Sequence, residues 1–120
     1  MDQVKDRSPA NMEENIKKAL TELLVLHLFS EGSHYIGELT DIIKCRSAGM
    51  LTVVFPYAVF YRIYKAGLII EEKKKVSPDG RLRQYYQITE DGLKYLEELL
   101  ASYNKISHAI HQILFPNGGH

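Results

Sequence analysis

The sequence predicts a mainly α-helical protein that carries one small β-hairpin. Three observations predict this fold class. Apolar residues recur at spacings of three and four in the first third of the 120-residue chain, which is typical of one face of a helix. Two strand-like segments then flank the turn-forming sequence Ser77-Pro78-Asp79-Gly80, as in a hairpin. Finally, apolar residues with a heptad period run through the last quarter of the chain, which predicts one long helix.

The N-terminal helix is predicted to start at Asn11. Asn11 and Glu14 have the spacing of a capping box, and Pro9 argues against an earlier start. The inward positions of this helix share helical spacing; they are Ile16, Leu20, Leu23, Leu24, His27 and Leu28. Gly32 ends the helix at about residue 30, because glycine accepts the backbone conformation that follows a helix.

Two shorter helices are predicted to follow. The second covers about residues 35–44, with its isoleucines and Leu39 pointing inward. The third covers residues 55–66, where Pro56 fits only the first turn and Gly67 closes the helix. With Phe60 and Ile63 buried, steps of about 100° per residue leave the other side of this helix facing solvent. The outward residues are Ala58, Tyr61, Arg62 and Lys65.

The hairpin and the last helix complete the prediction. The strands cover residues 68–76 and 81–88, and Lys74, Lys75, Arg81 and Arg83 lie at the tip of the hairpin. Thr89 caps a helix that runs to about Phe115, and acidic residues in its first turn favour the positive end of the helix dipole. The sequence 116–119, Pro-Asn-Gly-Gly, then stops it.

Composition limits what the protein can be. Fifteen basic and 15 acidic residues balance, and 45% of the chain is apolar, so a single globular domain is expected. No apolar run approaches the roughly 20 residues of a membrane-spanning helix, and residues 1–10 do not resemble a secretory signal. The single cysteine, Cys45, excludes an internal disulfide and suits a reducing cytoplasm. We expect a cytoplasmic protein with no membrane contact.

The charge is distributed unevenly along the chain. Residues 53–88 contain seven basic and three acidic side chains, whereas residues 89–101 are acidic. A neutral protein with one basic segment can bind phosphate at that segment alone.

Three helices followed by a ribbon with a basic tip are the element order of a winged helix-turn-helix. In that fold the third helix is narrow enough for the major groove of DNA, and the hairpin reaches the flanking backbone or the minor groove. The residues expected to contact double-stranded DNA are Thr52, Tyr57, Ala58, Tyr61, Arg62, Lys65, Lys73, Lys74, Lys75, Arg81 and Arg83. Arg62 is the best candidate for a base or a bidentate phosphate contact, because its guanidinium is planar.

Two segments also resemble a known family. Residues 57–69, Tyr-Ala-Val-Phe-Tyr-Arg-Ile followed by Lys-Ala-Gly-Leu-Ile after Tyr64, are similar to the recognition helix of PadR-type bacterial transcriptional regulators. Residues 83–93, Arg-Gln-Tyr-Tyr-Gln-Ile-Thr-Glu-Asp-Gly-Leu, resemble that family's second wing strand and the start of its dimerisation helix. The resemblance covers about residues 14–100 and implies a homodimeric repressor that responds to a ligand or signal.

The heptad positions of the last helix predict homodimerisation. A helix of about 26 residues spans roughly 39 Å, more than a small winged domain can cover, and its distal half would otherwise expose an apolar stripe. The expected interface residues are Leu96, Leu99, Tyr103, Ile106, Ile110 and Ile113. An effector between the long helices and the first helices would meet Tyr103, His108 and Phe115.

The chain is therefore expected to divide into a flexible tail (1–10), a winged helix-turn-helix domain (11–88), a C-terminal dimerisation helix (89–115) and a disordered tail (116–120).

Other residues give little sign of chemistry. His108 and His111 have a spacing that could share a metal, but no third ligand accompanies them, so solvated histidines and no metal are expected. Cys45 is expected to be a small buried apolar residue and not a redox sensor. No catalytic constellation is visible, so no enzyme activity and no cofactor are expected.

The main functional hypothesis is a dimeric regulator that represses transcription by binding a pseudo-palindromic operator. The alternative is a winged module that binds another protein through its apolar 48–61 surface and does not bind DNA.

Overall fold

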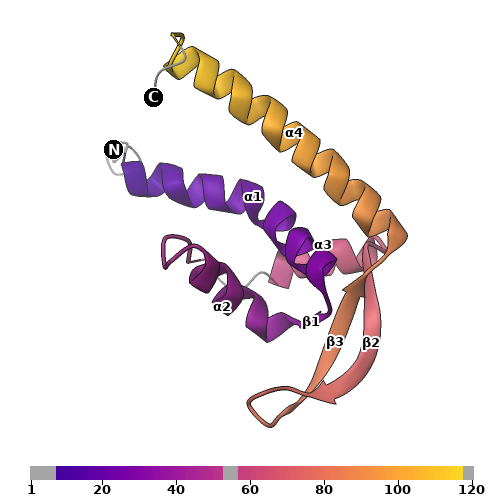
Figure 1. The fold of residues 1–120 in the computed structure, drawn as a ribbon. Coiled ribbons are helices and arrows are strands. Elements are labelled where there is room, and N and C mark those ends of the chain that lie inside the picture. Colours follow the sequence, from indigo (N-terminus) through magenta and orange to yellow (C-terminus); the bar gives the residue numbers. More distant parts are fainter. Residues whose placement is uncertain (1–7, 53–56, 118–120) are drawn as a thin grey trace, which may run out of the picture.

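A computed structural model describes residues 8–52 and 57–117. The elements in order are α1 (Pro9–Glu31), β1 (His34–Tyr35), α2 (Ile36–Arg46), α3 (Tyr57–Lys65), β2 (Ile69–Val76), β3 (Leu82–Ile88) and α4 (Glu90–Leu114) (Figure 1). The predicted fold class is confirmed. The terminal residues of both predicted tails, and the predicted start of the third helix at residues 55–56, lie outside the described residues.

Helix α1 begins earlier than predicted. Ser8 is the N-cap, and its Oγ accepts a hydrogen bond from the Asn11 backbone N–H at 3.2 Å. Pro9 takes the first helical position, where its missing N–H costs nothing. The prediction that Asn11 caps this helix is therefore wrong, because the proline favours the helix start that it was expected to prevent.

The core forms around the C-terminal half of α1. Val25, Leu26 and Phe29 are almost completely buried, and they meet Leu39 of α2 and Ile63 of α3. The other buried apolar residues of this core are Leu23, Leu28, Ile43, Ile69 and Leu96. Cys45 does not belong to it: contrary to expectation, this residue is exposed near the end of α2.

The sheet has three strands, in the order β1-β3-β2. The predicted hairpin is confirmed, with β2 and β3 antiparallel and Val76 opposite Leu82 at the tip. A bulge interrupts the register between Glu71 and Lys74. The two-residue β1, which pairs with Tyr85 and Tyr86, was not predicted.

A set of backbone contacts joins α3, β2 and α4. The Leu68 N–H donates to the Ile63 carbonyl at 2.9 Å. Thr89, the N-cap of α4, donates its hydroxyl to the Gly67 carbonyl at 2.7 Å and its N–H to the Leu68 carbonyl at 2.9 Å. The same hydroxyl accepts the Gly92 N–H at 3.0 Å. The end of α3, the start of β2 and the start of α4 therefore form one hydrogen-bonded junction.

Helix α4 ends at Leu114, one residue before the expected end near Phe115, and extends away from the rest of the chain (Figure 1). Its heptad positions divide into two groups. Leu96 lies in the core of its own chain and Leu99 is half-buried against that core, so Leu96 is not available to a partner. The exposed positions are Tyr103, Ile106, Ile110 and Ile113.

Candidate nucleic-acid interface

One side of α3 is fixed to the protein by aromatic rings. Phe60 and Tyr64 stack nearly parallel, with ring centroids 5.8 Å apart. Both meet Tyr86 of β3 edge-on, at 4.8 and 5.8 Å. Together with the buried Ile63, these contacts set the rotation of the helix about its axis and leave the opposite side exposed to solvent. The exposed residues of that side are Tyr57, Ala58, Tyr61, Arg62 and Lys65.

This exposed side of α3 borders two shallow depressions. Arg62 and Lys65 line one of about 810 Å³, whose far wall includes Glu22 of α1 and Tyr95 of α4. Tyr95 donates its hydroxyl proton to the Glu22 carboxylate at 3.3 Å, and partial burial, with Glu22 adding to it, raises the pKa of Tyr95. Arg62 therefore lies on the flank of α3 that faces α1 and α4. Lys65 lies 5.7 Å from the ring centroid of Tyr61.

Tyr57 lies on the opposite flank, next to the hairpin of β2 and β3, which we call the wing. It lines a depression of about 290 Å³ together with Tyr35 and Gly37 at the start of α2 and Arg83 of β3. The structure thus brings Tyr57 near Arg83, two residues that the sequence placed in the same contact set.

Lys74 and Lys75 of β2 lie on different faces of the hairpin. Lys74 pairs with Gln84 and Lys75 with Arg83, and alternate residues of a strand point to opposite faces. The Lys75 ammonium lies 4.3 Å from the ring centroid of Tyr85, and the Arg83 guanidinium lies 4.8 Å from that of Tyr35. Two predicted contact residues, Lys75 and Arg83, are thus already engaged within the chain.

Hydrogen bonds to Asp79 hold the turn at the wing tip together. The Asp79 carboxylate accepts hydrogen bonds from the Ser77 hydroxyl, from the Arg83 guanidinium at 2.6 Å and from the Arg81 N–H at 3.2 Å. These donors, Ser77 foremost, hold the pKa of Asp79 well below its ordinary value. Gly80 supplies the left-handed conformation, with φ of +84°, that the turn requires.

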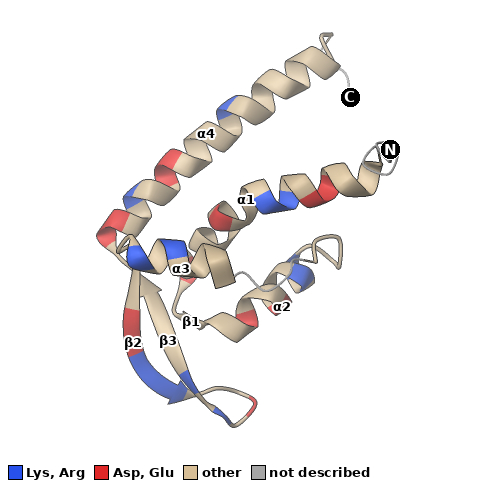
Figure 2. Ribbon diagram, turned by 180° about the vertical axis from the view of Figure 1, so that it is seen from behind, with Lys and Arg blue, Asp and Glu red and all other residues tan. Residues whose placement is uncertain are grey.

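The remaining cations of the hairpin that were expected to contact DNA are Lys73, Lys74 and Arg81. All three are exposed, and no ion pair involves them in the part of the chain that the structure describes. We call these three the wing patch, and Arg62 with Lys65 the helix patch. Glu71 and Glu72 lie between the two patches on β2, where the acidic stretch is visible in Figure 2.

The hydrogen bond described for Thr52 connects it to α1 and not to either patch. Thr52 is exposed, and its backbone carbonyl accepts a hydrogen bond from the Lys17 ammonium of α1 at 2.9 Å.

The sequence reasoning missed several residues at these sites. Tyr35 and Gly37 reach the wing only because β1 pairs with β3, and two residues are too short to show a pattern. Val76 and Leu82, which are exposed at the wing tip, could have been found, because apolar residues beside a cationic turn break the expected pattern of a solvated loop.

Neither a metal site nor a membrane span emerges from the residues that the structure describes. No group of three or more His, Cys, Asp or Glu side chains there could hold a metal ion. Within residues 8–52 and 57–117, no helix is long and apolar enough to cross a membrane.

Three helices, a strand that joins a two-stranded ribbon, and cations on the third helix and the ribbon tip define a winged helix-turn-helix protein. Residues 25–98 match the PadR-like family of transcriptional regulators. The chain belongs to this family, which confirms the resemblance and the class of transcription regulator.

Solved structures agree with this assignment. A PadR-like transcriptional regulator from Bacillus cereus is 27% identical, with a TM-score of 0.71, and the match covers 88% of this chain and 99% of that one. A PadR family regulator from Eggerthella lenta has a TM-score of 0.74 at 21% identity, over 90% and 93% of the two chains. A regulator from Clostridium thermocellum has a TM-score of 0.72 at 22% identity, over 82% and 93%. The last two show the fold alone. No curated protein sequence matches the chain.

Proposed function

We propose that this regulator is a homodimeric repressor that binds operator DNA and releases it in response to a small ligand or signal. In each subunit α3 would occupy a major groove, and the wing would contact the flanking backbone or minor groove.

The observation that carries the DNA-binding part is the presence of exposed cations on two adjoining elements. Arg62 and Lys65 lie on the exposed side of α3, and Lys73, Lys74 and Arg81 are exposed on the wing without ion pairs among the described residues. Exposed guanidinium and ammonium groups bind phosphate, whereas the outward side chains of α3 would supply sequence preference.

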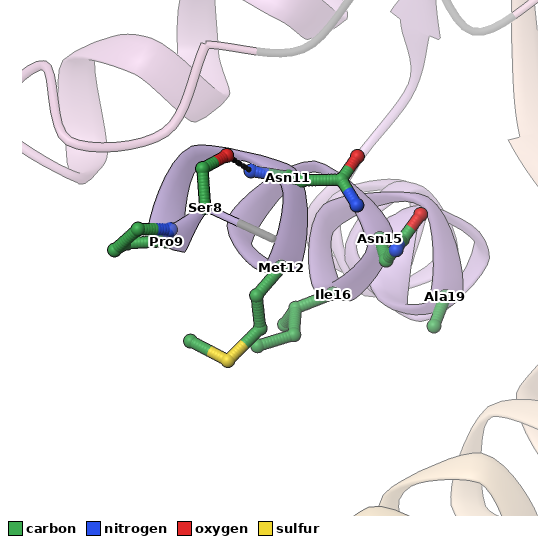
Figure 3. A pocket seen from close by; sticks show the side chains of 7 residues that line it. All are labelled: Ser8, Pro9, Asn11, Met12, Asn15, Ile16 and Ala19. Carbon is green, nitrogen blue, oxygen red and sulfur yellow. Dashed lines mark hydrogen bonds between the residues drawn. The ribbon is translucent and has the colours of Figure 1, made fainter. Parts of the chain in front are cut away.

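The exposed seam of α4 supports the homodimer. Ile106 is 56% exposed and Ile110 is 49% exposed, on a helix that extends beyond its own core. Helix α1 offers a second apolar surface: Met12, Ile16 and Ala19 project from one side of it (Figure 3). A second copy of α4 would cover both surfaces, and two-fold pairing is the common solution for such helices.

A depression between α1 and α4 supports the response to a ligand. It has a volume of about 260 Å³ and is lined mainly by apolar side chains, among them Leu20, Leu23, Leu99, Tyr103 and Ile106. An apolar ligand held here would change the angle of α4 and shift the population between dimers that can and cannot bind DNA.

Binding to a labelled 30-base-pair duplex of random sequence, measured by fluorescence anisotropy over a range of salt concentrations, tests the DNA-binding proposal. We expect affinity to fall steeply with salt, and Arg62→Ala and Lys74→Ala each to reduce the slope of log K against log salt by about one. Lys105→Ala on α4, outside both patches, serves as the matched control and should leave the slope unchanged. No binding even at low salt would contradict the proposal and favour the protein-interaction module instead.

A further inference from the structure

The last residue pair of the wing before its turn is apolar and exposed. Val76 and Leu82 lie directly opposite each other across the ribbon, and their side chains are 67% and 66% exposed. Each could therefore bury most of its apolar surface against a partner, which favours binding by roughly 25 cal/mol per Å².

This pair lies on the face of the ribbon that also packs against the recognition helix. Side chains alternate along a strand, so Leu82, Gln84 and Tyr86 of β3 share one face. Tyr86 contacts Phe60 and Tyr64 of α3, and Lys74 is the cross-strand partner of Gln84. From α3 to the tip, this face therefore presents an aromatic cluster, then a lysine, then the apolar pair.

The turn holds the pair in a defined position. Ser77 donates its N–H to the Arg81 carbonyl at 2.8 Å directly beyond the pair, and Gly80 donates to the Ser77 carbonyl at 2.8 Å. The Asp79 carboxylate connects this turn to Arg83. A binding surface that is already ordered loses little conformational entropy when it meets its partner.

The charges around the pair identify the chemistry of that partner. Lys74 precedes Val76 on the same face, Arg81 adjoins Leu82, and neither cation forms an ion pair within the described residues. An apolar centre with cations at its edge complements the minor groove of DNA, whose walls are sugars and whose rims are phosphates. Minor-groove proteins commonly combine basic residues with apolar side chains in this way.

We infer that Val76 and Leu82 contact the sugar walls of the minor groove beside the major groove that α3 occupies, with Lys74 and Arg81 on the phosphates at its rims. This inference rests on the proposed function. It adds a contribution to DNA affinity that does not depend on salt, because apolar contacts release no counterions.

The test uses a duplex enriched from a random-sequence pool by the wild-type chain. The double variant Val76→Ser/Leu82→Ser should bind this duplex roughly tenfold more weakly at every salt concentration, as expected when part of two apolar side chains is lost from an interface. The salt slope should equal that of the wild type. Lys74→Ala, by comparison, should reduce the slope by about one.

Ile70→Ser is the matched control. Ile70 is an exposed apolar residue of the same strand, but it pairs with Gln87 and so lies on the opposite face at the base of the wing. Its substitution should leave affinity unchanged. Circular dichroism establishes that each variant is folded, and Val76→Thr, which keeps a β-branched side chain in the strand, replaces the double variant if that variant unfolds.

Wild-type affinity in the folded wing-tip variant would overturn the inference, as would a reduced salt slope, which would mean that the pair acts only by positioning cations. An equal loss in Ile70→Ser would also overturn it. A wild-type chain that enriches no duplex at all contradicts the proposed function, a distinct outcome.

Discussion

Gly92 allows α4 to pack closely against the residues before it because glycine has no side chain. It is buried in the first turn of α4, and a Cβ there would lie 2.2 Å from the Leu68 carbonyl oxygen and 2.6 Å from Cγ1 of Ile88. The carbonyl cannot easily retreat, because it accepts the hydrogen bond from the Thr89 N–H. The glycine of the Thr-Glu-Asp-Gly sequence thus permits the close approach of α4 to the wing.

Gly92→Ala should therefore lower the free energy of unfolding by about 1–3 kcal/mol, the usual cost of overpacking a core, measured by urea denaturation. Gly37→Ala is the control: its Cβ would meet the side chains of Tyr35, at 3.2 Å, and Arg83, at 3.9 Å, and no backbone atom among these nearest neighbours. Alanine also favours a helix by about 1 kcal/mol over glycine. Equal stability of the Gly92 variant and the wild type would contradict the packing argument.

Asp79 gives the wing tip a defined pH dependence. Its pKa is lowered in the folded chain, first by the Ser77 hydroxyl and then by Arg83. The contribution of the carboxylate to stability is therefore complete above the ordinary aspartate pKa of about 4 and declines as the pH falls below it.

An NMR titration of the Asp79 carboxyl carbon should show a midpoint well below pH 4. Ser77→Ala should move this midpoint upward, since it removes the strongest donor, whereas Ser107→Ala on α4 should not. A wild-type midpoint near pH 4 would show that the turn does not hold the carboxylate as described.

At the scale of elements, α4 combines two roles. Its first turns are part of the core through Leu96, while Ile106 and Ile110 are exposed on the distal turns. Because only the distal part would meet the second chain of the proposed homodimer, its substitution should affect association more than folding.

Ile106→Glu/Ile110→Glu should shift the molar mass measured by light scattering from two chains toward one, since it places charges in an apolar contact. Truncation after Ser102 should do the same. Asn104→Glu adds a charge to a different side of the same helix and should leave the dimer intact. A dimer that persists in the double variant would place the interface elsewhere.

The sequence predicted the long elements well, because each carries enough periodic residues to define a face and a start or stop signal. It failed where tertiary contacts decide. Strand β1 forms because its two residues pair with Tyr85 and Tyr86 of β3. Leu96 fits the heptad equally well whether its own core or a second chain buries it.

The sequence likewise predicted only part of the candidate site. Helical geometry was sufficient to predict which residues of α3 face outward. It could not reveal that Arg83 and Lys75 are held over Tyr35 and Tyr85, since those contacts depend on the register of β2 against β3 and on a strand that the sequence did not predict.

At the scale of the whole molecule, the proposed homodimer should protect two half-sites of one operator. Two reading heads related by a two-fold axis bind half-sites about one helical turn, roughly 34–36 Å, or a multiple of it apart. Hydroxyl-radical footprinting on an enriched duplex should show two such protected clusters. The Ile106→Glu/Ile110→Glu variant should require more protein and lose the cooperative appearance of both clusters. A single protected cluster for the wild type would contradict the dimeric arrangement.

The junction at Thr89 has a mechanical consequence. Helix α4 has 25 residues and is therefore roughly 37 Å long. Its base is hydrogen-bonded to Gly67 and Leu68, which join α3 to β2. If α4 tilts about this hydrogen-bonded base by about 10°, its far end moves by roughly 6 Å over that length. Because Thr89 links the base of α4 to the segment that joins α3 and β2, the same tilt would turn α3 and the wing together.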